Sequence, residues 1–498
     1  MADIDAAEAA FVKLLDDLAT IEESELTWLE IATRLLKFCR RYAPSAARWG
    51  GLGIGEPWRT VLNVELSAAA DLIAVDPAFF VQQPGGAPGK LVASSSLASR
   101  EHVQALLSAA KDALSATPFV DTQMSVAVVA RGLAGAIDNL AGSTYLSWFR
   151  SRGKVTIKEG EPYPVCNHDP RPLLGTHAAN TNPAIKPKRD LSFTPSLRIA
   201  TGPLAFTYVL DFTLWDRLSP LASTSNGLVM AAAQPNLNLL EFNTQSDATP
   251  STPATWYANH GPPNTAQQVD RITRLIGVAM AQEAEVVLLP EYAASETVYN
   301  ALEAALSAST APLVFCIGIS RPDNNNYVKN EAWLRVSTPG MSYSYSKHFH
   351  AKTSGAKLLG ADERIRTASE IRVFISQKWS LSVLICVEVL AGEIVDQLAK
   401  IGTNLLLVPA MSESTTSMVA DVSDLCQDSQ AFVVMANGPG QWWAMPNPPC
   451  EALFAGPYAS SPSSWTAPLP GQNRQLTQIA SWVFRTSQRT VSLHQLPP

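Results

Sequence analysis

The sequence predicts an α/β domain in the C-terminal half of the chain, preceded by a mainly helical N-terminal domain. From Gly227 onward, short apolar runs alternate with helical patterns, which is typical of strand and helix units in a sheet with covered faces. Before about residue 150, apolar residues recur at the spacing of amphipathic helices. The length of 498 residues is too great for one ordinary core, so more than one domain is expected.

We expect three segments: a helical domain over 1–150, a β-containing connector or subdomain over 151–226, and the α/β domain over 227–498. In the first segment the apolar spacing predicts two helices within 6–43 and one each within 97–114 and 122–140. The second segment has short β-favouring runs and many prolines.

Nine strands are expected in the α/β domain, with helices between several of them. They are Leu228–Ala233, Glu285–Leu289, Leu313–Ile319, Ala332–Val336, Ser342–Ser346, Ile371–Ile375, Leu381–Ile385, Asn404–Val408 and Phe432–Ala436. The segment Pro235–Pro263, after the first strand, is rich in Pro, Thr and Asn and reads as a long loop. Long loops in compact domains are usually functional or disordered.

Composition argues against several classes of protein. The formal net charge of −7 is mild, and the basic run at Lys186, Lys188 and Arg189 is short, so we expect no nucleic-acid partner. The stretches Val126–Leu140 and Leu204–Leu214 are interrupted by charged residues, so neither offers the roughly 20 clean residues of a membrane span. We therefore expect no membrane association.

The N-terminal residues and the cysteines suggest a cytoplasmic protein. The first ten residues are acidic and carry no basic and apolar pattern of a cleaved export signal. The six cysteines are scattered without close pairs, which fits reduced thiols. Cys166-Asn167-His168 has no second pair at zinc spacing, so no metal is expected. No cofactor is expected either.

Three reactive residues follow apolar strands, where open α/β sheets place their chemistry. Glu291 follows a buried run and a proline, which would hold a partly desolvated carboxylate suited to a general base. Lys347 ends an alternating strand and could stabilise an oxyanion. Cys386 lies between a strand and a helical pattern, where a cysteine can gain nucleophilic character. Taken singly, such residues are more often a surface carboxylate, a common strand-end lysine and an inert buried thiol.

In type and in order along the chain, these residues resemble the nitrilase, or carbon–nitrogen hydrolase, superfamily. The resemblance covers about Leu228 to Ser487. It includes an opening strand that ends in Ala233-Gln234, the Pro-Glu at Glu291, Tyr345-x-Lys347, Cys386-x-Glu388, Gly402 to Pro409 and Gln430 to Gly438. The chain departs from the pattern at Phe349, where the family has a histidine, and at Gly392, where it has a proline.

The resemblance implies an αββα sandwich and a hydrolase that cleaves an amide, or possibly a nitrile or carbamoyl C–N bond, through a cysteine thioester. Cys386 would be the nucleophile, Glu291 the base, Lys347 the oxyanion stabiliser and Glu363 the second glutamate, although Glu370 is also available. Substrate contacts are expected from a further set of residues, which comprises Tyr292, Val387, Glu388, Asn437 and Trp442. The partner would be a small amide-like molecule.

Two alternatives remain open at this stage. One is a soluble acyltransferase that uses the same cysteine with an amine or alcohol acceptor. The other is a non-enzymatic or regulatory module of this fold within a larger assembly, for example in prokaryotic defence, which the extra N-terminal residues motivate. Because the family often dimerises, we also expect a homo-oligomer.

Overall fold

The computed structural model separates the chain into an N-terminal unit of residues 1–167 and 186–204 and a C-terminal unit of residues 168–185 and 205–498. The structure describes residues 2–22, 27–42, 56–77, 80–82, 91–93, 95–116, 122–165, 169–175, 191–223, 227–249, 251–307, 312–336, 341–352, 360–440, 449–458, 464–467, 476 and 478–496.

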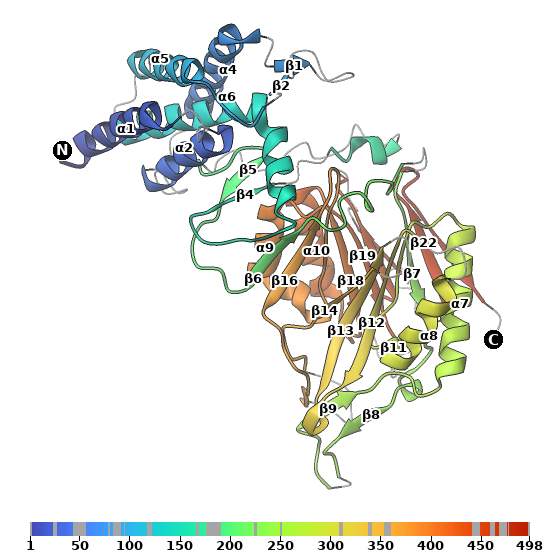
Figure 1. Ribbon diagram of the computed structural model, residues 1–498. Coiled ribbons are helices and arrows are strands. Elements are labelled where there is room, and N and C mark those ends of the chain that lie inside the picture. Colours follow the sequence, from blue (N-terminus) through green and yellow to red (C-terminus); the bar gives the residue numbers. More distant parts are fainter. Residues whose placement is uncertain are drawn as a thin grey trace. The chain divides into compact units, whose positions relative to one another are not determined.

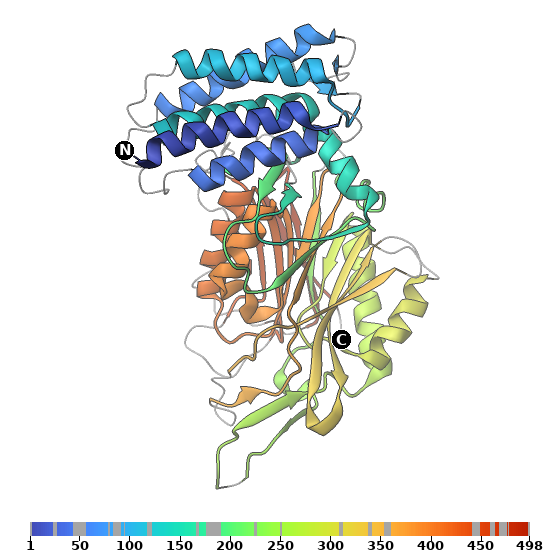
Figure 2. The ribbon, with the colours of Figure 1, turned by 60° about the vertical axis from the view of Figure 1, so that its left-hand side comes forward.

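The N-terminal unit contains helices that pack around α6 (Figures 1 and 2). They are α1 (Ala2–Thr20), α2 (Trp28–Tyr42), α4 (Glu56–Val75), α5 (Arg100–Ala116) and α6 (Thr122–Ser151). A Cβ atom at Gly132 of α6 would lie 2.6 Å from the Cβ of Val64, so the glycine allows α4 to approach closely. Among the described residues, Met124–Ser151 is long and apolar enough to cross a membrane, but 94% of its tested window is buried inside the structure, as in a core helix.

Short strands complete the described part of this unit. β1 (Phe80–Gln82) pairs with β2 (Leu91–Ala93), and β4 (Pro162–Pro164) pairs with β5 (Leu197–Ile199); both pairs are antiparallel. β3 covers Lys154–Thr156.

The first large sheet of the C-terminal unit has the order β14-β13-β12-β10-β7-β22-β23, and β11 pairs with β12. Its strands are β7 (Val229–Gln234), β10 (Val286–Leu288), β11 (Ala294–Ser295), β12 (Val314–Pro322), β13 (Val328–Val336), β14 (Ser342–Ser346), β22 (Ala480–Arg485) and β23 (Thr490–Gln495). The central strands β7, β10 and β12 run parallel, and β7 and β10 are buried at every position.

The second large sheet has the order β21-β20-β19-β18-β17-β16-β6 among the strands of this unit. These are β6 (Thr207–Asp211), β16 (Glu370–Ile375), β17 (Ser380–Val383), β18 (Leu405–Ala410), β19 (Phe432–Asn437), β20 (Ala452–Ala455) and β21 (Ser464–Ala467). Strands β7, β10 and β12 of the first sheet contact β18 and β19, so the two sheets face each other.

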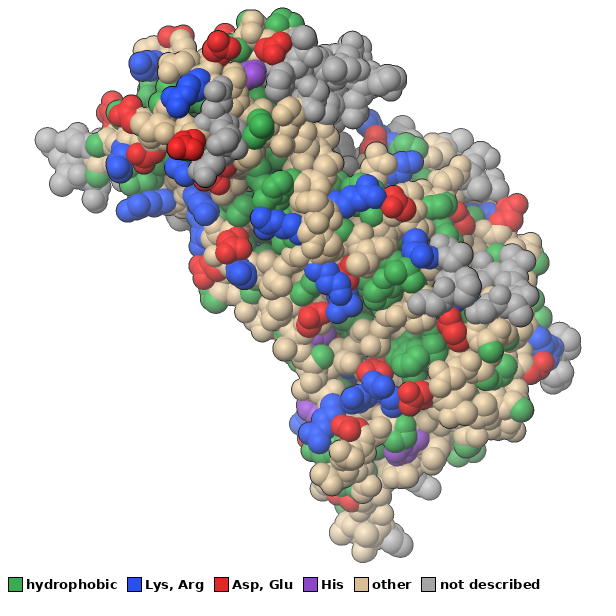
Figure 3. All heavy atoms as spheres, viewed as in Figure 1, with side chains coloured by type: hydrophobic (Ala, Val, Ile, Leu, Met, Phe, Trp, Pro, Cys, Tyr) green, Lys and Arg blue, Asp and Glu red, His purple; other side chains and the backbone are tan. Residues whose placement is uncertain are grey.

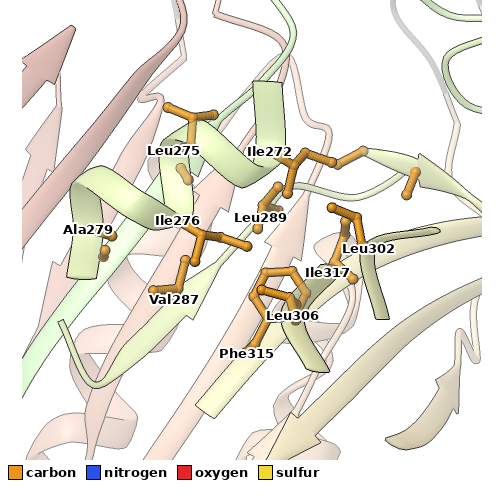
Figure 4. Packing of buried hydrophobic residues seen from close by; sticks show 14 of the residues in the cluster. Ile272, Leu275, Ile276, Ala279, Val287, Leu289, Leu302, Leu306, Phe315 and Ile317 are labelled. Carbon is orange, nitrogen blue, oxygen red and sulfur yellow. The ribbon is translucent and has the colours of Figure 1, made fainter. Parts of the chain in front are cut away.

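Helices cover the outer faces, which gives a helix, sheet, sheet, helix arrangement. On the first sheet, α7 (Thr265–Ala281) and α8 (Glu296–Ser307) bury Ile272, Ile276 and Leu302 against Val287 and Phe315 (Figure 4). Beside the second sheet, α10 (Thr416–Ser429) contacts β19 and β20 and packs against α9 (Gly392–Ile401). Burial of these apolar side chains is the main favourable contribution to the fold.

A third sheet has the order β15-β9-β8 and includes the segment expected to be a loop. β8 (Thr244–Ser246) and β9 (Trp256–Asn259) form an antiparallel pair within Pro235–Pro263, and β9 pairs in parallel with β15 (Asp362–Glu363). Before β8 lies a short 3-10 helix, η5 (Leu239–Glu241). The segment expected to be a long loop therefore contains two short strands, and the pairing of β9 with β15, about 100 residues later, leaves no local signal in the sequence.

All nine expected strands are present, with ends that shift by a few residues. The separate connector over 151–226 is corrected, since the two units divide this segment between them. β6 joins the second sheet through β16, whereas β4 and β5 pair within the N-terminal unit. Helix α4 was not predicted, and α6 continues beyond the expected end at residue 140 to Ser151.

On the face shown in Figure 3, acidic and basic side chains are interspersed.

Candidate active site

Glu291 lies just beyond β10, held by tight contact with β12. The Gly318 N–H donates to the Pro290 carbonyl oxygen at 3.1 Å. A Cβ atom at Gly318 would lie only 2.4 Å from the Glu291 Cα, so only glycine permits this approach. The next residue, Tyr292, has a left-handed backbone with φ of 61°. These contacts fix the backbone position of Glu291. Its carboxylate projects into the interior, and the residue is only 2% exposed.

Lys347 follows β14, and its buried ammonium bridges two carboxylates. The Nζ atom lies 2.7 Å from Glu291 Oε1 and 2.7 Å from Glu363 Oε2. Asn330, on β13, donates from Nδ2 to Glu291 Oε1 at 2.6 Å and to Glu363 Oε1 at 2.8 Å. The Asn330 carbonyl oxygen also accepts from the Lys347 N–H at 2.9 Å. The amide and the ammonium therefore hold the two carboxylates on either side of them.

Of the two candidates for the second glutamate, the structure brings Glu363 into this cluster. Its carboxylate accepts hydrogen bonds from Lys347, Asn330, the Tyr292 hydroxyl and the Ala351 N–H. Glu370 instead lies at the exposed start of β16 and forms an ion pair with Arg372 at 2.7 Å.

The two clustered carboxyl groups have pKa values that move in opposite directions. Burial raises the pKa of Glu291, and the nearby charge of Glu363 adds to this effect. Burial also acts to raise the pKa of Glu363, but Lys347 and the Tyr292 hydroxyl outweigh it and hold that pKa below its ordinary value. For Lys347, burial acts to lower the pKa, yet the two carboxylates raise it well above the ordinary value. Glu363 and Lys347 therefore keep their charges, while Glu291 is the group suited to gaining and losing a proton.

Cys386 occupies a sharp turn after β17. It has φ of 54°, a left-handed conformation that is uncommon for cysteine, and it begins a 3-10 helix, η7 (Cys386–Leu390). Burial raises the pKa of its thiol, and the charge of Glu291 adds to this, while Lys347 and a hydrogen bond from the Met411 N–H act in the opposite direction. The resting sulfur is therefore a neutral thiol that needs a base.

Glu388 ties the Cys386 turn to the end of β14. Its carboxylate accepts from the Ile385 N–H at 2.5 Å, the His348 N–H at 2.5 Å and the Tyr345 hydroxyl at 3.1 Å. His348 Nδ1 also lies 2.7 Å from Glu388 Oε1. Because His348 follows Lys347 directly, this network links the position of Cys386 to that of the Lys347 ammonium. A substrate contact by Glu388 stays a prediction, and one of these donors would have to give way to it.

Asn437 also makes contacts that position its surroundings. Its Nδ2 donates to the carbonyl oxygens of Ser412 and Cys450 at 3.0 and 2.9 Å, and its Oδ1 accepts from the Ser412 N–H at 2.8 Å. Ser412 follows Met411, whose N–H contacts the Cys386 sulfur. The substrate role expected for Asn437 stays untested.

The other expected substrate contacts have different positions. Tyr292 is in the cluster through its hydroxyl. Val387 is the second residue of η7, and first-turn N–H groups have no intrahelical acceptor. Trp442 lies outside the described residues. Within the described ranges, no group of three or more His, Cys, Asp or Glu side chains could hold a metal ion.

Sequence reasoning missed two residues of this region. Asn330 lies in the middle of β13, where nothing in the local pattern marks it as different from an ordinary buried polar residue. Tyr257 lies on β9, in the segment expected to be a loop, and its nearness to Glu363 depends on the pairing of β9 with β15. The only signal for Tyr257 was the unusual length of Pro235–Pro263.

No family model matches the chain, and no curated protein matches its sequence. Solved structures that are similar to it include three proteins. A glutamine-dependent NAD+ synthetase from Acinetobacter baumannii in complex with ADP has 14% identity, over 54% of this chain and 48% of that one, and a TM-score of 0.38. This chain therefore spans about half the length of that synthetase.

The second similar structure is a cysteine-to-alanine mutant of the Nesterenkonia AN1 amidase from the nitrilase superfamily. It has 16% identity over 51% of this chain and 89% of that one, with a TM-score of 0.37. The third is Saccharomyces cerevisiae Nit3, a member of branch 10 of the nitrilase superfamily, with 11% identity over 46% and 82% of the two chains and a TM-score of 0.34. Each of these matches covers about half of this chain.

Proposed function

We propose that the C-terminal unit is a carbon–nitrogen hydrolase that cleaves a small amide through a thioester on Cys386. The observation that carries this proposal is the buried cluster of Glu291, Lys347 and Glu363 acting on a cysteine in a strained turn. A nucleophile, a base whose pKa is raised, and a fixed cation are the parts that acyl transfer requires.

In the first half of the reaction, the Glu291 carboxylate takes the proton from the Cys386 thiol as the sulfur attacks the amide carbon. The carbonyl oxygen becomes an anion, which Lys347 and the Val387 N–H stabilise. The C–N bond then breaks, Glu291 returns the proton to the leaving nitrogen, and ammonia or an amine departs. A thioester remains on Cys386.

Water completes the cycle. Glu291 takes a proton from the water as its oxygen attacks the thioester carbon, and the C–S bond breaks to release a carboxylic acid. Glu291 then returns the proton to the sulfur. Glu363 keeps its negative charge throughout and holds Lys347 in place, because its pKa is lowered while that of Glu291 is raised.

The test is intact-protein mass spectrometry after exposure to a panel of small amides at neutral pH. We expect an acyl adduct on Cys386 that is absent in Cys386→Ala and that forms more slowly in Glu291→Gln. The matched control is Cys426→Ala, which removes another fully buried thiol on α10 and should leave the adduct unchanged. Absence of any adduct and of any amide turnover would contradict the proposal. An added amine that captures the acyl group faster than water would favour acyl transfer.

A further inference from the structure

The Tyr257 side chain lies beside the cluster, and no described residue forms a hydrogen bond with its hydroxyl. β9 and β15 pair in parallel with Tyr257 opposite Glu363. Directly paired residues of neighbouring strands place their side chains on the same face of a sheet. The flanking residues confirm this alternation, since the Arg364 guanidinium stacks 4.5 Å from the Trp256 ring on the other face. Tyr257 therefore points to the side on which Glu363 meets Lys347.

The Tyr257 hydroxyl interacts electrostatically with all four members of the proposed catalytic set. Burial raises the pKa of the Tyr257 hydroxyl well above its ordinary value, and the groups that also act on it are Glu363, Lys347, Glu291 and Cys386. The phenol is therefore neutral, and it offers both a donor and an acceptor.

Other tyrosines of the site are already committed to protein partners. The Tyr292 hydroxyl donates to Glu363, and the Tyr345 hydroxyl donates to Glu388. Within the described part of the chain, no atom shares a hydrogen bond with the Tyr257 hydroxyl, and its side chain is partly exposed. A polar group in this position that is partly open and unpaired is available to a ligand.

We propose that Tyr257 is a substrate-binding residue, whose hydroxyl hydrogen-bonds to the amide group of a substrate held at Cys386. This inference rests on the proposed function and assigns the site to small carboxamides, which can both donate to and accept from the phenol. The segment Pro235–Pro263 then contributes directly to specificity. An acyl compound that lacks the amide N–H and carbonyl pair would gain less from this contact.

The test compares two thiol reagents on the full-length protein, iodoacetamide, which carries a primary amide, and methyl methanethiosulfonate, which carries none. Labelling of Cys386 is followed by mass spectrometry in the wild type, in Tyr257→Phe, and in Tyr327→Phe. The last variant is a matched control, because the Tyr327 ring lies against Arg364 and Arg366, and among the described residues no hydrogen bond joins its hydroxyl to the cluster. The ratio of the two labelling rates cancels any change in the reactivity of the thiol itself.

We expect Tyr257→Phe to lower the ratio of iodoacetamide to methanethiosulfonate labelling about three- to tenfold, the effect of one lost hydrogen bond to an uncharged group, with no change in Tyr327→Phe. An unchanged ratio in Tyr257→Phe, in a protein whose Cys386 reacts normally, would overturn this inference and leave the proposed function intact. If both reagents slow equally, the hydroxyl acts on the thiol rather than on the amide, and the inference is wrong. If wild-type Cys386 reacts with neither reagent, the proposed function fails and the inference fails with it.

Discussion

Replacing Lys347 by methionine should expose how strongly the cluster depends on one cation. The methionine side chain is similar in length to that of lysine but carries no charge. Glu291 and Glu363, each at most 2% exposed, would lose the ammonium group that lies 2.7 Å from both carboxylates. Removing one partner of a buried ion pair costs about 3–5 kcal/mol, because the remaining charge stays buried. We expect Lys347→Met to lower the free energy of unfolding of the C-terminal unit by this amount at pH 8. The double variant Lys347→Met/Glu363→Gln should recover part of it, since it removes the repulsion.

The pH dependence gives an independent check on this cause. Without the cation, the carboxyl groups in the folded protein have pKa values above those of the unfolded chain, so the folded state binds protons more tightly. Stability then falls as the pH rises above about 4.5, by about 1.4 kcal/mol per pH unit for each such group, until the pH passes the folded-state pKa. The difference in the free energy of unfolding between the wild type and Lys347→Met should therefore be smaller at pH 5 than at pH 8.

Urea unfolding can be followed by the labelling of Cys426, which is fully buried in the C-terminal unit and reports on that unit alone. The midpoint in urea for Cys426 labelling should be clearly lower in Lys347→Met than in the wild type. A midpoint that does not change, or a deficit that grows as the pH falls, would refute the electrostatic reasoning.

Three further predictions concern Glu363 and two residues that position the cluster and Cys386. Glu363→Gln removes a charge that raises the pKa of Glu291, so the acidic limb of the pH profile for acylation should move to lower pH; an unmoved or raised limb would contradict this. Glu388→Gln loses a carboxylate that holds the nucleophile turn, so kcat should fall about 10- to 100-fold with a much smaller change in KM; a change in KM alone would instead support substrate binding. Gly318→Ala places a Cβ atom 2.4 Å from the Glu291 Cα and should cost about 1–3 kcal/mol, measured by urea unfolding against Gly277→Ala, which meets nothing within 4 Å.

The strand-end residues could be predicted because each is marked by the chain around it. Apolar runs fix the strands that precede Glu291 and Cys386, and an alternating run fixes the strand that ends at Lys347. Parallel strands within a covered sheet consist of nearly continuous runs of apolar residues, which explains why their positions were predicted with small errors. The local sequence does not show that the side chains of Glu291, Lys347 and Cys386 lie close together. Only the order of these residues along the chain suggested it.

The sequence favoured Glu363 over Glu370 but left both open, because their positions depend on a pairing between distant strands. Both carboxylates precede the same predicted strand, Ile371–Ile375, and both lie among polar residues. β15 has only two residues, and it is a strand only because β9 lies beside it. The same pairing brings in Tyr257. One unforeseen pairing therefore accounts for the position of Glu363 and for the missed Tyr257, whereas Asn330 was missed for a different reason, because it lies within β13 without a distinguishing local pattern.

The directions of the pKa shifts restrict where a proton can move in this cluster. Lys347 holds its proton more firmly than an ordinary lysine, so it can stabilise an anion but is a poor acid. Glu363 is held ionised by Lys347, so it is a poor base. Glu291 and Cys386 both have raised pKa values, so both bind protons more tightly than ordinary groups of their kind. In the proposed reaction the mobile proton is therefore confined to these two residues, and because a thiol is ordinarily a weaker acid than a carboxyl group, its transfer to Glu291 would become favourable only as the sulfur bonds to the amide carbon.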